Sequence, residues 1–206
     1  MNIGLGNLTE LKGQLLAASL RSDTNYDNVI AAIGQGVAAQ FDHYCNRKLA
    51  RLQNDTDQFR ADRRHYYLPR YPVESISQCQ RQDTLTQGWA TLAVTDLIQQ
   101  WNLHIGYIAF GATQGDEFSQ LLVTYTGGFW FDTSEDGSQT LPVGASPLPA
   151  DLKFAWYLQC QNVWRQWDKL GNQIAEAPEG QTAGQTLQLA PAVKELLDEH
   201  RRLFAS

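Results

Sequence analysis

The sequence has little of what disulfide frameworks, metal sites and membrane spans require. Its three cysteines are an odd number, and Cys45, Cys79 and Cys160 lie far apart, which favours buried, reduced thiols in a cytoplasmic setting over disulfide bridges. Neither a CxxC nor an HxxxH spacing occurs among the cysteines and the four histidines, so the sequence predicts no metal site. No segment approaches about 18 consecutive apolar residues, so we predict no membrane span and expect a soluble protein.

Positive charge is also scarce. The 206 residues include 16 lysines and arginines against 22 aspartates and glutamates, a formal net charge of −6. This balance disfavours a broad, sequence-independent grip on nucleic acid, because the phosphate backbone would be repelled. An acidic surface is useful where DNA has to slide past without being held. The length predicts one domain, or one domain with a small appendage, and the hydrophobic fraction of 43% predicts a folded core.

Apolar residues at three- and four-residue spacing predict three helices, over residues 8–20, 26–49 and 149–169. The third begins at Pro149, a residue that the first helical turn tolerates, and Asp151 suits the positive N-terminal end of that helix.

Two glycines interrupt the second predicted helix. Gly34 and Gly36 each cost about 1 kcal/mol relative to alanine inside a helix. We therefore expect another helix or another subunit to pack closely at these positions. Beyond the third helix, a Gly-, Gln- and Ala-rich arm is predicted over 171–188, and a final amphipathic helix over 190–204.

The middle of the chain is predicted to be β structure. Alternating polar and apolar residues bounded by turn residues are typical of strands in a half-exposed sheet. The predicted strands cover residues 64–68, 73–80, 103–110 and 120–126, while 92–100 fits a strand or a short helix. The last strand stops at Gly127-Gly128, and a long polar loop leads from there to Pro149. No catalytic group stands at this junction between strand and helix.

No catalytic or cofactor-binding residue is predicted. His43 and Cys45 are two residues apart on a predicted helix, so their side chains point to different faces and do not form a Cys–His nucleophilic pair. Carboxylate pairs such as Asp132 and Asp136 lie in loops without apolar surroundings that would raise a pKa. We therefore predict that the protein is not an enzyme.

Residues 60–71 form the one basic and aromatic cluster of the chain, with four arginines and three tyrosines. Such a cluster could stack on and neutralise nucleic acid, which would make the protein a small nucleic-acid-binding module. Arginine and tyrosine are also enriched at protein interfaces, and we favour that interpretation for a strand that carries them.

The order of four segments resembles a known family. They are residues 41–49 (FDHYCNRKL), 71–76 (YPVESI), 123–129 (VTYTGGF) and 148–155 (LPADLKFA). This arrangement, which covers most of residues 8–168, is similar to the head–tail connector proteins (adaptor or head-completion proteins) of long-tailed bacteriophages and prophages. The resemblance implies an α+β fold, namely a mainly α-helical bundle with an inserted antiparallel β portion at about 57–126. It also implies a connector core over 1–170, followed by a C-terminal arm and helix over 171–206.

For function, the resemblance implies a structural adaptor of the virion neck that is assembled in the host cytoplasm. Copies would form a homo-oligomeric ring, a dodecamer in most members, beneath the portal protein. The ring would extend the DNA channel, let DNA pass without specific binding, and offer a docking surface to a stopper or tail-terminator protein. Residues 171–204 would contact the portal. No cofactor and no membrane is implied.

The interface candidates are taken from the basic and aromatic cluster, from the residues after Gly128, and from the final helix. They are Arg63, Arg64, Tyr66, Tyr67, Tyr71, Phe129, Trp130, Phe131, Val193, Leu196, Leu197 and Phe204.

Overall fold

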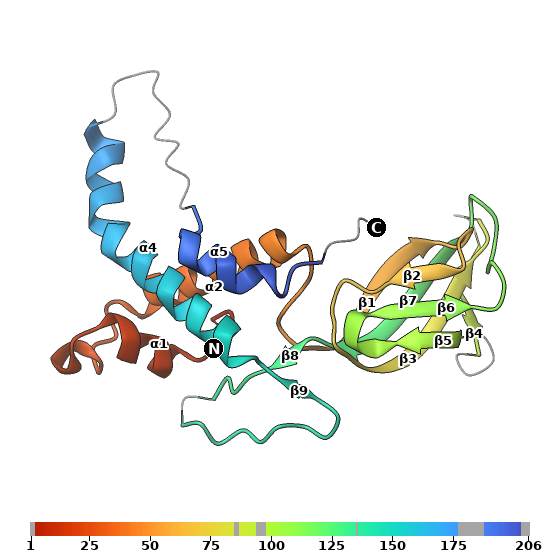
Figure 1. The fold of residues 1–206 in the computed structure, drawn as a ribbon, viewed down its shortest axis with the longest axis horizontal. Coiled ribbons are helices and arrows are strands. Elements are labelled where there is room, and N and C mark those ends of the chain that lie inside the picture. The colour runs from red at the N-terminus through yellow and green to blue at the C-terminus, as the bar shows by residue number, and fades with distance from the viewer. Residues whose placement is uncertain (1–2, 85–86, 94–97, 135, 177–187, 203–206) are drawn as a thin grey trace. The chain divides into compact units, whose positions relative to one another are not determined.

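The computed structural model describes residues 3–84, 87–93, 98–134, 136–176 and 188–202, and they fall into two compact units (Figure 1). The helical unit contains residues 1–45, 131–140 and 148–201, and the β unit contains 46–130, 141–147 and 202–206. Helix accounts for 35% and strand for 27% of the chain. The expectation of a mainly α-helical bundle is therefore wrong, because the β portion is a unit with several antiparallel sheets and a core of its own.

The predicted helices are present in the helical unit, with different ends. Asn7 caps the first helix by accepting a hydrogen bond from the backbone N–H of Glu10 at 2.8 Å. The second helix stops at Cys45, short of the expected end at 49, because Asn46 takes a left-handed backbone conformation with φ at 51°. The elements are α1 (Leu8–Leu15), the 3₁₀ helix η1 (Ala18–Leu20), α2 (Asp27–Cys45), α4 (Ala150–Glu176) and α5 (Pro191–Asp198).

The contact between α2 and α4 is centred on Trp156. This side chain is fully buried, and its indole Nε1 donates a hydrogen bond to the backbone oxygen of Gly34 at 3.0 Å. A Cβ atom at Gly34 would lie 2.4 Å from the backbone oxygen of Ile3, so only glycine fits at this close approach. The expectation of close packing is thus confirmed at Gly34. Gly36 is different, since a Cβ atom there would meet nothing within 4 Å.

Helix α5 packs against α2 and α4 within the helical unit. Val193 and Leu197 are buried, and the Tyr44 hydroxyl donates a hydrogen bond to Asp198 at 2.8 Å. A second polar link is made by Gln159 of α4, whose side chain is completely buried. Its Nε2 donates to the backbone oxygen of Gln188 at 3.1 Å, and its Oε1 accepts from the backbone N–H of Ala190 at 3.1 Å.

We expect Gln159→Ala to loosen the start of this C-terminal segment. The substitution removes both hydrogen bonds to the backbone of residues 188 and 190, each of which contributes about 0.5–1.5 kcal/mol. Amide hydrogen exchange in α5 should therefore accelerate, while exchange in the β unit stays unchanged. Gln161→Ala, which removes a more exposed glutamine from the same helix, is the matched control. Equal exchange rates for α5 in both variants would contradict the prediction.

The β unit consists of two antiparallel sheets and a short parallel pair. The larger sheet has the strand order β1-β7-β3-β4, the smaller one has the order β2-β6-β5, and β8 pairs with β9 in parallel. The strands are β1 (Leu52–Arg60), β2 (His65–Tyr67), β3 (Val73–Gln82), β4 (Ala90–Leu92), β5 (Ile98–Asn102), β6 (Tyr107–Phe110), β7 (Gln120–Gly127), β8 (Phe129–Trp130) and β9 (Ser146–Pro147).

These strands confirm the predictions for 64–68, 73–80 and 120–126. In the predicted strand 103–110 the first residues form a 3₁₀ turn instead (η2, Leu103–Ile105), and only β6 is extended. The stretch 92–100 contains the end of β4 and the start of β5, and residues 94–97 lie outside the described part of the chain.

Side chains from the two antiparallel sheets form the core of the β unit. Its buried residues are Ala61, Tyr66, Leu68, Tyr71, Val73, Cys79, Ile108, Phe110, Leu121, Val123 and Tyr125. Tyr66 and Phe110 meet edge to face at a centroid distance of 5.6 Å. Burial raises the pKa of the Cys79 thiol to about 11, so this cysteine is an inert part of the core. None of the helices among the described residues combines the length and apolarity that crossing a membrane requires.

Candidate assembly surfaces

The basic and aromatic cluster at 60–71 is divided by the strand that it forms. In β2 the side chain of Tyr66 points into the core, and its hydroxyl donates to the backbone oxygens of Arg60 at 2.9 Å and Arg63 at 2.7 Å. Tyr66 therefore braces the turn before β2, and burial raises its pKa. Arg63 and Arg64 stand exposed on this turn, and neither forms an ion pair within the described residues.

Tyr67, in β2, and Tyr71, in the loop after it, have different surroundings. Tyr67 lies half-buried beside Tyr107 at a centroid distance of 5.3 Å. Tyr71 is buried, and the Arg47 guanidinium lies over its ring at 3.4 Å. The same guanidinium lies 5.1 Å from the ring of Phe129, so Arg47 brings two of the predicted interface residues together.

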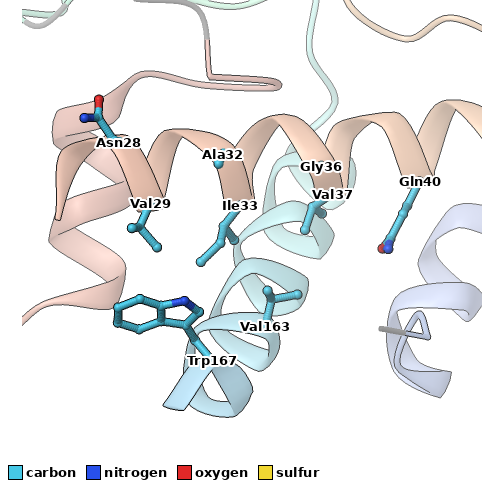
Figure 2. A pocket seen from close by; sticks show the side chains of 9 residues that line it. All are labelled: Asn28, Val29, Ala32, Ile33, Gly36, Val37, Gln40, Val163 and Trp167. Carbon is cyan, nitrogen blue, oxygen red and sulfur yellow. The ribbon is translucent and has the colours of Figure 1, made fainter. Parts of the chain in front are cut away.

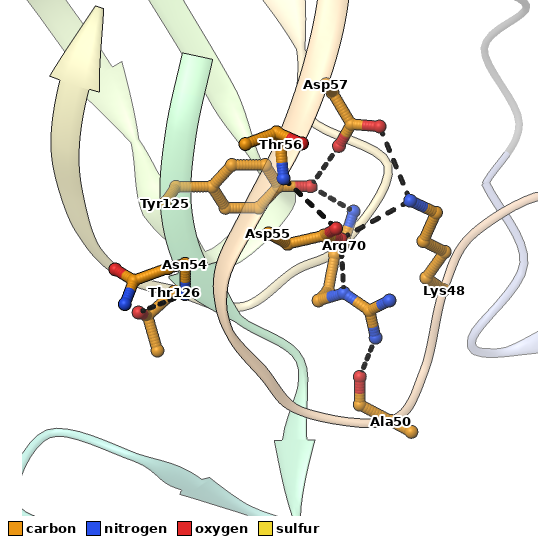
Figure 3. Close-up of polar contacts among 9 residues, drawn as sticks. All are labelled: Lys48, Ala50, Asn54, Asp55, Thr56, Asp57, Arg70, Tyr125 and Thr126. Atoms are coloured by element: carbon orange, nitrogen blue, oxygen red, sulfur yellow. Dashed lines mark hydrogen bonds and ion pairs between the residues drawn. The ribbon is translucent and has the colours of Figure 1, made fainter.

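Behind these aromatics, a polar network joins the start of the β unit to its central strand. Figure 3 shows Asp55 and Asp57 of β1 facing Lys48, Arg70 and Tyr125. Arg70 Nε donates to Asp55 Oδ2 at 2.7 Å, and the Tyr125 hydroxyl donates to Asp57 Oδ2 at 2.5 Å. The Lys48 ammonium lies 3.3 Å from Asp55 and 3.4 Å from Asp57. Arg70 is held here and Tyr66 and Tyr71 are buried, so Tyr67 is the one tyrosine of the 60–71 cluster that remains partly exposed for stacking on bases.

The network shifts two pKa values in opposite directions. Burial raises the pKa of Tyr125 strongly, and its hydrogen bond to the Asp57 carboxylate raises it further. At Asp55, burial raises the pKa, but the hydrogen bonds and positive charges of Arg70 and Lys48 outweigh burial and bring the net pKa below the ordinary value of 3.8. Tyr125 therefore stays neutral as a donor, and Asp55 stays ionised as an acceptor.

The depressed pKa of Asp55 makes the stability of the β unit depend on acid pH. A carboxylate whose pKa is lowered by folding contributes stability that is fully present above its unfolded pKa of about 3.8 and is lost as the pH falls through the folded value. We expect thermal unfolding followed at pH 6, 4 and 3 to show a loss confined to the lower pH values. In Asp55→Asn this acid-dependent part should shrink. An identical pH profile in wild type and variant would contradict the role of Asp55.

The loop between β6 and β7 holds an exposed aromatic side chain in a rigid turn. The Asp116 carboxylate accepts hydrogen bonds from the backbone N–H groups of Phe118 at 3.0 Å and Ser119 at 2.9 Å, and from the Ser119 hydroxyl at 2.7 Å. These hydrogen bonds lower the pKa of Asp116. Phe118, at the tip, is 72% exposed. The backbone N–H of Ala61 donates to Ser119 O at 2.9 Å, which ties the turn to the loop that carries Arg63.

An apolar groove of about 450 Å³ runs between α2 and α4 in the helical unit. Figure 2 shows Val29, Ile33 and Val37 of α2 facing Val163 and Trp167 of α4 across it. Ala32, Gly36 and the polar Asn28 and Gln40 complete the lining. We call this feature the α2–α4 groove. Trp167 remains 40% exposed at its edge.

The other predicted interface residues have the following positions. Val193 and Leu197 are buried against the helical unit, whereas Leu196 of the same helix is half-buried. Trp130 and Phe131 are half-buried as well. Phe204 lies outside the described residues. The assignment of all these residues to an interface stays a prediction.

Sequence reasoning missed Phe118 and the α2–α4 groove. Nothing in the pattern around 114–119 marks the phenylalanine as exposed, since a single aromatic in a turn equally fits a core. The groove did have a signal, the glycine at 36 inside a helix. Within the described residues, no group of three or more His, Cys, Asp or Glu side chains could hold a metal ion.

No protein-family model and no curated protein matches the chain. Solved structures do share its fold, among them two chains from gene transfer agent particles. One is a chain from the neck of an empty gene transfer agent particle, computed with C6 symmetry, with a TM-score of 0.61 at 12% identity. The other is a chain from the virion of a native gene transfer agent particle, with a TM-score of 0.57 at 14% identity. Each match covers 97% of this chain and 90% of the other. Over nearly its whole length, the chain therefore has the fold of a protein from such a particle.

Proposed function

We propose that this protein is a structural, non-enzymatic component of the neck of a phage-like particle. The observation that carries the proposal is the fold similarity to a neck chain, because it extends over both units and not only over a common helical or β motif. The independent resemblance of residues 41–49 and 148–155 to head–tail connector proteins supports the same role. The location in this proposal is the virion, after assembly in the host cytoplasm.

In finer terms, we propose that copies of the chain form a ring, a dodecamer, under the portal protein. A twelvefold ring contains the sixfold symmetry used for the similar neck structure. Its far side would receive a stopper or tail-terminator protein, and DNA would pass through the lumen. The net charge of −6 supports passage without specific binding, because an acidic wall repels phosphate.

The portal contact is proposed for the C-terminal part of the chain, residues 171–204. Removing all of it would be an unsuitable test, because Val193 and Leu197 would leave the helical core together with the proposed contact. Leu196→Asp is a sharper variant, since Leu196 is only half-buried on the same helix. We expect it to weaken capture by immobilised portal protein while the circular dichroism spectrum stays native.

The role in the neck is tested by deleting the gene in its host and examining the particles. We expect filled or empty heads without tails, and restoration of tailed particles by a plasmid copy of the gene. In wild-type particles, quantitative mass spectrometry should find the protein in a fixed ratio to the portal protein. Normal tailed particles in the deletion strain, or absence of the protein from purified particles, would refute the proposal.

A further inference from the structure

Arg202 attaches the C-terminal segment to the β unit through aromatic rings. Helix α5 ends at Asp198, and Arg202 is the first residue after it that belongs to the β unit. The Arg202 guanidinium lies over the ring of Tyr67 at 5.0 Å from its centroid and over the ring of Tyr71 at 5.8 Å. These two cation–π contacts hold the side chain in place.

The guanidinium is held there at a cost. Its Nη2 atom is buried and has no hydrogen-bond acceptor among the described residues. Burial lowers the pKa of Arg202, because water is partly removed from the charge and no carboxylate of the described chain takes its place. The guanidinium of Arg47, which carries the same charge, lies over the same Tyr71 ring at 3.4 Å. The two positive charges repel each other across this ring.

The attractive and the unfavourable contributions are of similar size. A cation–π contact at a partly desolvated site shifts an equilibrium constant by about tenfold in favour of the contact. A buried N–H group of a charged side chain without an acceptor shifts it by about tenfold or more in the other direction. The attached state of Arg202 is therefore separated from a detached state by a small free-energy difference, so a partner that binds the detached state can shift the balance.

We propose that residues 199–202 form a reversible strap. In the free protein Arg202 fastens this strap to Tyr67 and Tyr71, and docking on the portal protein releases it to pair with a carboxylate there. The exchange is favourable because a carboxylate supplies the charge-assisted hydrogen bonds that Nη2 lacks on the β unit. The inference rests on the proposed portal contact of residues 171–204 and adds a regulatory step to it.

The fastening is tested by amide hydrogen exchange of residues 199–202 in the isolated full-length protein. Tyr67→Leu removes the ring that lies closer to the guanidinium, so exchange should accelerate about fivefold. Tyr67→Phe keeps an aromatic face and should exchange like the wild type. Tyr107→Leu is the matched control, because Tyr107 packs against Tyr67 at a centroid distance of 5.3 Å but is not one of the two rings under Arg202.

Arg202→Met tests the cost of the buried charge. Methionine is an unbranched side chain that packs well on aromatic rings, and it has no N–H group that needs an acceptor. The strap should therefore be fastened more tightly, and exchange at residues 199–202 should slow about fivefold. A rate equal to that of the wild type, or faster, would contradict the cost assigned to the guanidinium.

The release is tested by capture on immobilised portal protein. Tyr67→Leu leaves the C-terminal segment unchanged but fastens it less, so half-maximal capture should need about threefold less protein than for the wild type. Arg202→Met should need about tenfold more. Unchanged or weaker capture of Tyr67→Leu would overturn the release on docking. Equal melting temperatures of Tyr67→Leu and Tyr67→Phe would show that the β unit stays intact, and Arg202→Met tests the strap without altering a strand.

These measurements separate the strap from the proposed function. Failure of the wild-type protein to bind the portal would refute the portal contact and the release on docking. Hydrogen exchange in the isolated protein would then still decide whether Arg202 fastens the strap. Identical exchange rates at residues 199–202 in the wild type, Tyr67→Leu and Arg202→Met would overturn the strap and leave the neck role intact.

Discussion

Replacing Trp156 with alanine is expected to lower the free energy of unfolding of the helical unit by about 3–5 kcal/mol, the range for removing a fully buried aromatic side chain. Trp156 is completely buried, and its ring fills the space that Gly34 and Gly6 leave open. The variant also leaves the backbone oxygen of Gly34 without its indole donor. Chemical denaturation followed by circular dichroism at 222 nm would measure the loss, since most of that signal comes from helix.

Two control variants separate the contributions at this site. Trp156→Phe keeps most of the apolar volume but removes the hydrogen bond to Gly34, so it should cost less than the alanine variant. Trp101→Ala removes an exposed tryptophan, 58% accessible, and should change stability by less than about 0.5 kcal/mol. Equal losses for Trp156→Ala and Trp101→Ala would show that α2 and α4 are not held together through this residue.

Arg70→Ala is expected to destabilise the β unit by about 1.5–3 kcal/mol, because Asp55 loses its closest charge-assisted hydrogen bond and keeps only the more distant Lys48 as a partner. The side chains of Arg70 and Asp55 are only 11% and 12% exposed. Arg70 also donates to the backbone oxygen of Ala50, so the loop before β1 loses a second support (Figure 3). Thermal unfolding at pH 7, observed through tyrosine and tryptophan absorbance, would measure the loss.

A second substitution distinguishes the electrostatic effect of losing the Arg70–Asp55 pair from a general loss of packing. Combining Arg70→Met with Asp55→Leu removes both charges and should recover much of the stability, since an apolar pair of similar size replaces a buried ion pair at little cost. Lys48→Ala, at the exposed side of the same network, should cost less than about 1 kcal/mol. A double variant as unstable as Arg70→Ala would contradict the electrostatic explanation.

The sequence predicted the helices well because each has a strong local signal. Pro149 and Asp151 mark the start of α4, and an apolar stripe through Leu152 and Trp156 continues along it. The end of α2 was misplaced because Leu49 is buried and fits the helical spacing, although the chain turns at Asn46. The helical spacing of apolar residues does not reveal that a buried residue such as Leu49 belongs to the next unit.

The extent of the β unit was harder to predict. Strand β1 (Leu52–Arg60) was not among the predicted strands, and the β portion was expected to start only at about 57. The strand was missed because its first residues are polar and it lies at the edge of its sheet, beside β7. Such a strand is defined by its partner and not by its own alternation. The alternation in β2 is consistent with Tyr66 pointing inward between His65 and Tyr67. The neighbouring arginines nevertheless favoured a surface position for Tyr66 in the sequence prediction.

The division of the helical unit into separated stretches has a consequence for the order of folding during synthesis. Helices α1 and α2 leave the ribosome first, but their partner α4 follows only after the whole of residues 46–130 has been translated. Most of the β unit is continuous in sequence, so it can close while the apolar side of α2, with Ile30 and Phe41, still lacks its cover. The first of these helices to be made are thus among the last to be packed, and their apolar side stays open to non-native contacts during that interval.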